Sequence, residues 1–210
     1  MRVPLLLYLG SAVEAAPLVA AVAAWRRVHR ARLWISVWCG VLTVCNAVQL
    51  WLGSRGVHNL WVSYVVTAAS ALVLWALSYW QTGDTARLTL RLAVVPLLVV
   101  WAVLTLAVED TSNFSRAAEP TAYLVCLAAA AYTLLARSLG SATELLRQDW
   151  FWVSAGLALY FGIWSAMGPL AVLLVSTSPQ LLAVAYQVAM ALNIVAFVAI
   201  ARGVTCPEAT

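Results

Sequence analysis

The sequence predicts an all-α membrane protein, a single domain over residues 1–210 that forms a bundle of about seven transmembrane helices. Hydrophobic residues make up 64% of the chain and charged residues only 10%, whereas a soluble domain has about 25% charged residues. The apolar residues form seven stretches separated by short polar breaks, and roughly 20 such residues cross the hydrocarbon core of a bilayer. The expected spans are 3–25, 33–53, 60–80, 89–108, 118–138, 150–175 and 180–201.

The distribution of arginine predicts the orientation of the chain, because cytoplasmic loops carry the excess of positive charge. All twelve basic residues are arginines, and the breaks after spans one, three and five, with the C-terminal tail, contain Arg26, Arg27, Arg30, Arg32, Arg87, Arg91, Arg137, Arg147 and Arg202. The other side receives only Arg2, Arg55 and Arg116, and its break at 109–119 is acidic. We therefore expect the N-terminus outside and the C-terminus inside.

The first span, 3–25, carries Glu14 near its middle. The start of this span resembles a secretory signal peptide, but the apolar stretch continues to Trp25 and then meets arginines, so we expect a retained span. An acidic side chain at that depth is costly and is a functional candidate by default. The alternative is a neutral Glu14 that only hydrogen-bonds neighbouring helices.

Spans two and three, 33–53 and 60–80, place amide and hydroxyl groups in the outer half of the bundle. Asn46 and Gln49 are one turn apart in span two, and Tyr64 and Thr67 are one turn apart in span three. Residues three or four apart share a helix face, so each pair is expected to point in one direction. Spans four and five, 89–108 and 118–138, are mainly apolar.

Spans six and seven, 150–175 and 180–201, add aromatic groups at a similar depth. Tyr160 and Trp164 are one turn apart in span six, just before Gly168–Pro169, where we expect the helix to break. Small residues such as Gly156 and Gly162 allow close approach of a neighbouring helix. The outer half of span seven contains two further polar side chains, Tyr186 and Gln187, and Asn193 lies deeper.

By depth, these groups can converge on one pocket near the outer face. The candidate ligand-binding residues are Glu14, Asn46, Gln49, Tyr64, Tyr160, Trp164, Tyr186 and Gln187. An aromatic wall with a few convergent polar groups is the usual composition of a small-ligand pocket. The alternative is a set of separate hydrogen bonds between helices, with Trp164 facing lipid.

The sequence argues against several classes of protein. The four cysteines have no metal-ligand spacing, and no cofactor motif is present. One deep carboxylate without a buried histidine does not support intramembrane hydrolysis, so we expect no catalytic residues. A retinal protein needs a lysine, which this chain lacks. No nucleic-acid partner is expected, because no basic face lies in water; the expected partners are membrane lipid, a small apolar ligand and a membrane protein.

Two stretches resemble a family of small bacterial seven-span membrane proteins that has no assigned activity. They are Gly56-Val57-His58-Asn59-Leu60-Trp61, and Asp149-Trp150-Phe151-Trp152-Val153-Ser154-Ala155-Gly156-Leu157-Ala158-Leu159-Tyr160-Phe161. The similarity covers about spans two to seven. The family often has an acidic residue in span three, where this chain has Thr67-Ala68-Ala69-Ser70.

A weak internal similarity relates the two halves of the chain: Trp34-Ile35-Ser36 opens span two and Trp152-Val153-Ser154 opens span six. It indicates a 3+1+3 pseudo-repeat about an axis along the membrane normal. This layout also resembles sugar carriers of the SWEET type, although their proline-glutamine signature is not matched at the expected helices.

These observations predict a non-enzymatic multi-pass protein that binds a small apolar or amphipathic ligand, as a sensor or an accessory subunit of a membrane complex. Arginine without lysine in an alanine-, leucine- and valine-rich chain indicates a GC-rich bacterial genome, and hence the inner membrane. The alternative is a facilitative small-solute carrier of SWEET-like layout. A carrier should contain a water path at the midplane, whereas a sensor or subunit should contain a closed pocket.

Overall fold

The computed structural model describes residues 5–24, 29–139 and 145–206. Within these ranges every regular element is helical, which confirms the all-α prediction. The elements are α1 (Leu5–Glu14), α2 (Ala16–Ala23), α3 (Arg30–Ser54), α4 (Trp61–Ala69), α5 (Ala71–Ser78), α6 (Asp84–Leu92), α7 (Val94–Val103), the π-helical turn η2 (Leu104–Val108), α8 (Ala118–Leu139), the 3₁₀ turn η3 (Leu145–Arg147), α9 (Asp149–Thr177) and α10 (Pro179–Thr205).

Six helical segments in the described ranges are long and apolar enough to cross a membrane. They are Arg30–Ser54, Trp61–Ser78, Asp84–Val108, Ala118–Leu139, Asp149–Thr177 and Pro179–Thr205. A seventh apolar helix, Tyr8–Ala23, is shorter. The structure therefore supports a membrane protein with six to seven candidate spans. The predicted ends of the first span, and Arg2, Arg26 and Arg27, lie outside the described residues.

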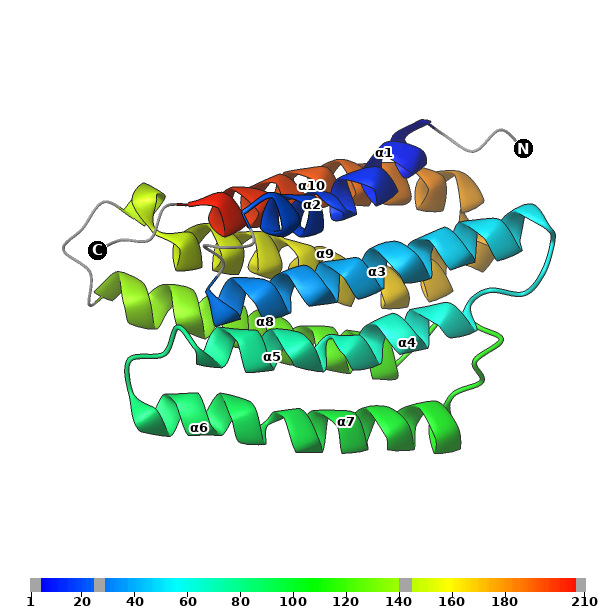
Figure 1. The fold of residues 1–210 in the computed structure, drawn as a ribbon. Coiled ribbons are helices and arrows are strands. Elements are labelled where there is room, and N and C mark those ends of the chain that lie inside the picture. Colours follow the sequence, from blue (N-terminus) through cyan, green and yellow to red (C-terminus); the bar gives the residue numbers. More distant parts are fainter. Residues whose placement is uncertain (1–4, 25–28, 140–144, 207–210) are drawn as a thin grey trace.

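The candidate spans run side by side and alternate in direction along the chain, with α1–α2, α4–α5 and α6–α7 each forming one segment, so that α1 begins at one end of the bundle and α10 ends at the other (Figure 1). The helix α9 packs against both α8 and α10, while α1 and α2 pack against α10 and α3. The α6–α7 segment forms an outer edge of the bundle next to α5 and α8, with Leu97 as the buried side chain of α7. The core therefore lies between α3, α5, α8, α9 and α10.

Two glycines set the close packing of α9 against α10. A Cβ atom on Gly156 would lie 2.6 Å from the carbonyl oxygen of Ala196, and a Cβ atom on Gly203 would lie 2.6 Å from Cγ2 of Val153. Small residues at such crossings let two backbones approach each other. Gly162 does not have this role, because its Cβ would meet only Leu127, at 3.9 Å.

Proline interrupts two of the helical segments but not the one expected from the sequence. The break between α1 and α2 falls at Ala15, just before Pro17, and the break between α6 and α7 falls at Ala93, just before Pro96. The break expected at Gly168–Pro169 is wrong, because α9 continues through Pro169 to Thr177. An interior proline removes one hydrogen bond, which a helix packed against its neighbours tolerates.

A buried ion pair closes the bundle at the end where α3 begins. The guanidinium group of Arg32, only 4% exposed, donates from Nε to Oδ2 of Asp149 (2.9 Å) and from Nη1 to the carbonyl oxygen of Cys206 (2.7 Å). The indole N–H of Trp80 also donates to Oδ2 of Asp149, at 3.2 Å. This cluster connects α3, the start of α9, the end of α10 and the end of the α4–α5 segment.

Candidate functional site: a carboxylate and aromatic cavity

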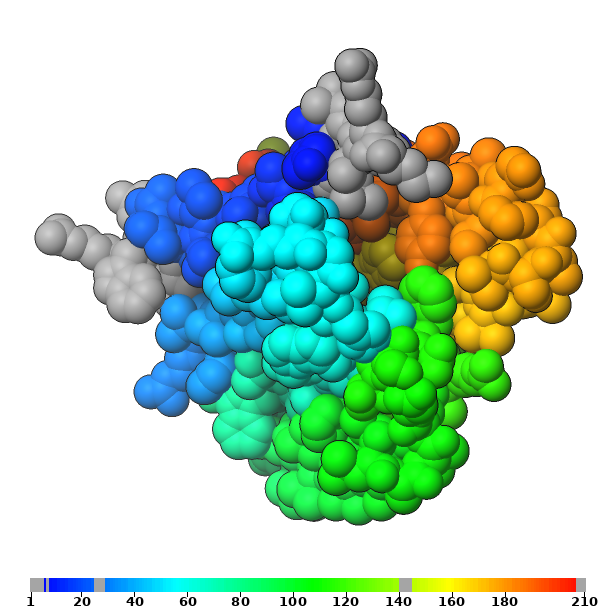
Figure 2. Space-filling model, turned by 90° about the vertical axis from the view of Figure 1, so that its right-hand side faces the viewer, coloured from blue at the N-terminus to red at the C-terminus, as the bar shows by residue number. Residues whose placement is uncertain are grey.

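A cavity of about 300 Å³ lies toward the opposite end of the bundle, where α3 ends and α8 begins. Figure 2 views this end directly and shows a hollow between the α3–α4 connection, the connection that precedes α8, and the helices α9 and α10. The lining residues come from α1, α3, α4, α8, α9, α10 and the two connections: Ser11, Glu14, Leu42, Asn46, Gln49, Leu50, Asn59, Leu60, Ser63, Val66, Phe114, Ser115, Glu119, Tyr123, Tyr160, Trp164, Tyr186 and Met190.

Glu14 anchors one wall of this cavity through side-chain hydrogen bonds to two other helices. It is 3% exposed, and its Oε2 accepts a short hydrogen bond from Nδ2 of Asn46 on α3. Its Oε1 accepts a hydrogen bond from Nδ2 of Asn193 on α10, at 3.0 Å. Oδ1 of Asn193 in turn accepts the indole N–H of Trp164 on α9, at 3.3 Å. One polar chain therefore links α1, α3, α9 and α10.

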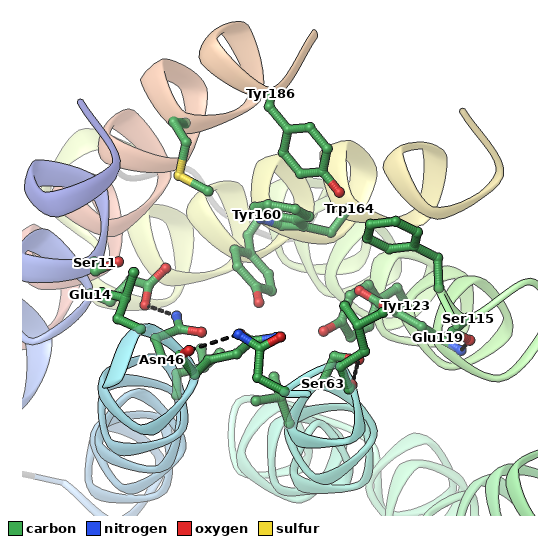
Figure 3. A pocket seen from close by; sticks show the side chains of 18 residues that line it. Ser11, Glu14, Asn46, Ser63, Ser115, Glu119, Tyr123, Tyr160, Trp164 and Tyr186 are labelled. Carbon is green, nitrogen blue, oxygen red and sulfur yellow. Dashed lines mark hydrogen bonds between the residues drawn. The ribbon is translucent and has the colours of Figure 1, made fainter. Parts of the chain in front are cut away.

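Aromatic rings from α8, α9 and α10 line the cavity. The ring of Tyr160 lies 6.4 Å from that of Trp164, which lies 6.3 Å from that of Tyr186. The hydroxyl of Tyr160 points into the space between Glu14 and the opposite wall (Figure 3). Tyr123 contributes a fourth ring, 6.0 Å from Tyr160. These rings provide broad apolar faces with polar edges, which suit a small amphipathic ligand.

Glu119 supplies a second carboxylate, on the wall opposite Glu14 (Figure 3). The sequence analysis places it both in the acidic break 109–119 and in the predicted span 118–138. The helix α8 begins at Ala118, as that span predicts, so Glu119 lies in the first helical turn. The following cavity residue, Tyr123, is four positions later on the same face. That spacing is the signal that sequence reasoning missed. An acidic residue in a first turn also interacts favourably with the helix dipole.

The connection before α8 is fixed at the edge of the cavity by Glu109. Its carboxylate accepts hydrogen bonds from the backbone N–H groups of Arg116 and Ala117 (both 2.5 Å) and from the hydroxyl of Ser115 (2.9 Å). Free N–H groups at a helix N-terminus bind anions in this way. His58 lies 2.9 Å from the carbonyl oxygen of Ser112 and joins the α3–α4 connection to this segment.

A turn on the outer side of this connection is centred on Asp110. Hydrogen bonds from the hydroxyl and the backbone N–H of Ser112 lower the pKa of the Asp110 carboxyl group below its usual value. Asp110 therefore keeps its negative charge at the end of the molecule where the cavity lies.

Six of the eight residues predicted for the site line the cavity: Glu14, Asn46, Gln49, Tyr160, Trp164 and Tyr186. Tyr64 and Gln187 do not line it. Tyr64 is buried in α4, whereas Gln187 lies on the exposed side of α10. Gln187 follows Tyr186 directly, and adjacent helical residues do not share a face. The two residues therefore lie on other helical faces than the one that lines the cavity.

A cluster of buried rings lies beneath the cavity. Trp38 packs against Tyr160 with ring centroids 5.3 Å apart, and against Phe197 at 6.1 Å. Phe161 lies 5.6 Å from Trp38 and 5.3 Å from Tyr123. Trp38, Phe161 and Phe197 are fully buried. These rings fill the middle of the bundle between the cavity and the Arg32–Asp149 pair.

The chemistry that this cavity offers is binding through charge, hydrogen bonds and aromatic faces. Among the described residues, no group of three or more histidine, cysteine or acidic side chains could hold a metal ion. The wall residues named above include neither histidine nor cysteine. No family model matches the chain, and no similar curated protein or solved structure was found.

Proposed function

We propose that this protein is a non-enzymatic, multi-pass protein of the bacterial inner membrane that binds a small apolar or amphipathic ligand as a sensor or accessory subunit. The observation that carries this proposal is the cavity of about 300 Å³, in which residues of six helices and two connections bring aromatic rings and a few polar groups together. Pockets for small ligands have about this size and composition.

The orientation proposed for the chain places this cavity at the outer face, with the N-terminus outside and the C-terminus inside. Support comes from the arginines. Among the described residues, Arg30, Arg87, Arg137, Arg147 and Arg202 belong to helix ends or connections at the end opposite the cavity. Positive charge concentrates on the cytoplasmic side of membrane proteins. A ligand would then enter from outside the cell.

The filled middle of the bundle favours a sensor or subunit over a carrier. A carrier needs a route past the midplane, and the layer below the cavity consists of the tightly packed Trp38, Phe161 and Phe197. The buried ion pair of Arg32 and Asp149 lies beyond them. The facilitative carrier of SWEET-like layout is the alternative, and it requires this ring layer to open.

Ligand binding can be tested by filling the cavity. A panel of small amphipathic compounds is screened by thermal shift on the purified protein and on Ser63→Phe, which places a ring in the cavity from α4. A ligand that binds only the folded state stabilises it by about 2.7 kcal/mol at a hundredfold excess over Kd. We expect shifts with the unaltered protein and with the control Ser54→Phe at the exposed end of α3, and none with Ser63→Phe.

Equal shifts in all three proteins would contradict binding in this cavity. The carrier alternative has a separate test, in which compounds that produce a shift are loaded into proteoliposomes and their exit is followed. Exit that depends on the protein and is blocked by Ser63→Phe would favour the carrier.

A further inference from the structure

The carboxylate of Glu119 has an unusual position for an acidic group in an apolar bundle. It lies in the first turn of α8, is partly buried, and lines the cavity. In the part of the chain that the structure describes, no hydrogen bond or ion pair reaches this carboxylate. A buried charge without a partner is costly. Apart from the dipole of α8, the described residues offer this carboxylate no compensating partner, which leaves it available to a ligand.

The two other acidic groups nearest to it are already engaged. Glu109 interacts electrostatically with Glu119, but its own oxygens accept the N–H groups at the start of α8. Glu14, on the opposite wall, accepts hydrogen bonds from two amides. Both therefore have structural partners, and Glu119 is the carboxylate left for a ligand.

The wall of the cavity contains acidic groups and no basic ones. The described wall residues contain two carboxylates, Glu14 and Glu119, and no arginine or histidine. The nearby arginines do not change this: Arg55 stacks over Trp51 with its guanidinium carbon 4.5 Å from the ring centre, and Arg116 is exposed. An anionic ligand would be repelled by an ionised Glu119, whereas a cation would neutralise it.

Aromatic rings next to a carboxylate are the groups that recognise an ammonium ion. Glu119 is close enough to interact electrostatically with Tyr123, Tyr160 and Tyr186. The face of an aromatic ring attracts a cation by about 0.5–2 kcal/mol, and more strongly out of water. The same rings bury the apolar substituents of such a cation.

We propose that the ligand of this cavity is an organic cation, an ammonium group with apolar substituents, whose charge lies beside Glu119 and whose apolar part packs on Tyr160, Trp164 and Tyr186. This inference rests on the proposed function, because it specifies the class of ligand for the same cavity. The role of Glu14 is to hold the opposite wall in place.

Two probes of equal shape, one charged and one neutral, separate the contribution of charge to the binding affinity from the contribution of shape. Benzyltrimethylammonium and neopentylbenzene differ only in a quaternary nitrogen replaced by carbon. Their affinities are measured by calorimetry on the full chain in nanodiscs of zwitterionic lipid, with empty nanodiscs as the reference for partition into lipid. The proteins compared are the unaltered chain, Glu119→Gln, and the control Asp84→Asn, which removes an acidic group that is exposed at the other end of the molecule.

We expect the unaltered chain and Asp84→Asn to bind the cation at least about tenfold more tightly than the neutral probe, which corresponds to about 1.4 kcal/mol. Glu119→Gln should lose this preference and keep its affinity for the neutral probe, which shows that the cavity is intact. Equal binding of both probes to the unaltered chain would overturn the cation inference and leave the proposed function standing. Binding of neither probe would overturn both.

Discussion

Glu14 holds three helices together through Asn46 and Asn193, and this role predicts how the position responds to substitution. Glu14→Gln keeps an oxygen that accepts one amide and a shape that fits the site, so we expect a small loss of stability. Glu14→Lys places a cation against two N–H donors in a buried site, and an unpaired buried charge costs about 3–5 kcal/mol. The measurement is the melting temperature and the folded yield of each variant in detergent.

A large loss of stability in Glu14→Gln, equal to that in Glu14→Lys, would contradict this explanation. It would mean that the full negative charge is required at the site, and not only a hydrogen-bond acceptor of the right shape.

The two cavity carboxylates also show what the sequence could and could not predict at the scale of single residues. Glu14 was identified because a lone acid in an apolar stretch is conspicuous. Glu119 was missed because it lies among other acidic residues of a polar break, where an acid is ordinary. Its importance depends on the helical face that it shares with Tyr123 in α8, and hydropathy alone does not show which face of a span lines a cavity.

At the scale of helices, the sequence predicted the apolar segments well and their interruptions poorly. Pro17, Pro96 and Pro169 lie in the interior of predicted spans, but α1 and α2 separate near Pro17 and α6 and α7 near Pro96, whereas α9 continues through Pro169. The difference lies in packing. The segments that break are short or peripheral, and α9 is held on both sides by α8 and α10. Such tertiary support cannot be seen in one sequence.

The contact of α9 with α10 gives a prediction with a built-in control. Gly156→Ala would bring a methyl group to 2.6 Å from the carbonyl oxygen of Ala196 and 2.7 Å from Cγ1 of Ile200. Overpacking of a tight core costs about 1–3 kcal/mol, so the melting temperature should fall. Gly162→Ala, in the same helix, meets only Leu127 at 3.9 Å and should leave it unchanged or raise it. Equal effects of the two substitutions would contradict the assigned packing.

The ion pair at the closed end predicts coupling between α3 and α9. Removing Asp149 leaves the buried guanidinium group of Arg32 with one carbonyl partner, and breaking a buried pair typically costs about 3–5 kcal/mol. We expect Asp149→Asn and Arg32→Gln each to lower the melting temperature strongly. The double substitution should lose less than the sum, because neither charge is then left alone. Additive losses would show that the two groups act independently.

At the scale of the whole molecule, the described residues form a bundle with two different ends. One end contains the cavity and the acidic segment around Glu109 and Asp110. The other contains the Arg32–Asp149 pair, a closed core, and the arginines at positions 30, 87, 137, 147 and 202. The positions of the arginines in the sequence predicted that positive charge gathers at one end of the bundle. The suggested 3+1+3 repeat stays a prediction, because the similar triplets at residues 34–36 and 152–154 are too short to establish a repeat.

The polarity leads to a prediction about which end faces the cell exterior. Ser112 is exposed on the connection beside the cavity, and Thr82 is exposed on the connection between α5 and α6 at the opposite end. Cysteines at these two sites are compared in intact cells with a maleimide that does not cross membranes. Of the natural cysteines, Cys39, Cys126 and Cys206 are buried, and Cys45 is replaced by serine in every protein compared.

We expect Ser112→Cys to be labelled directly and Thr82→Cys only after permeabilisation, because the arginine-rich side of a membrane protein is the cytoplasmic one. The opposite labelling pattern would invert the bundle, and the ligand would then have to enter the cavity from the cytoplasm.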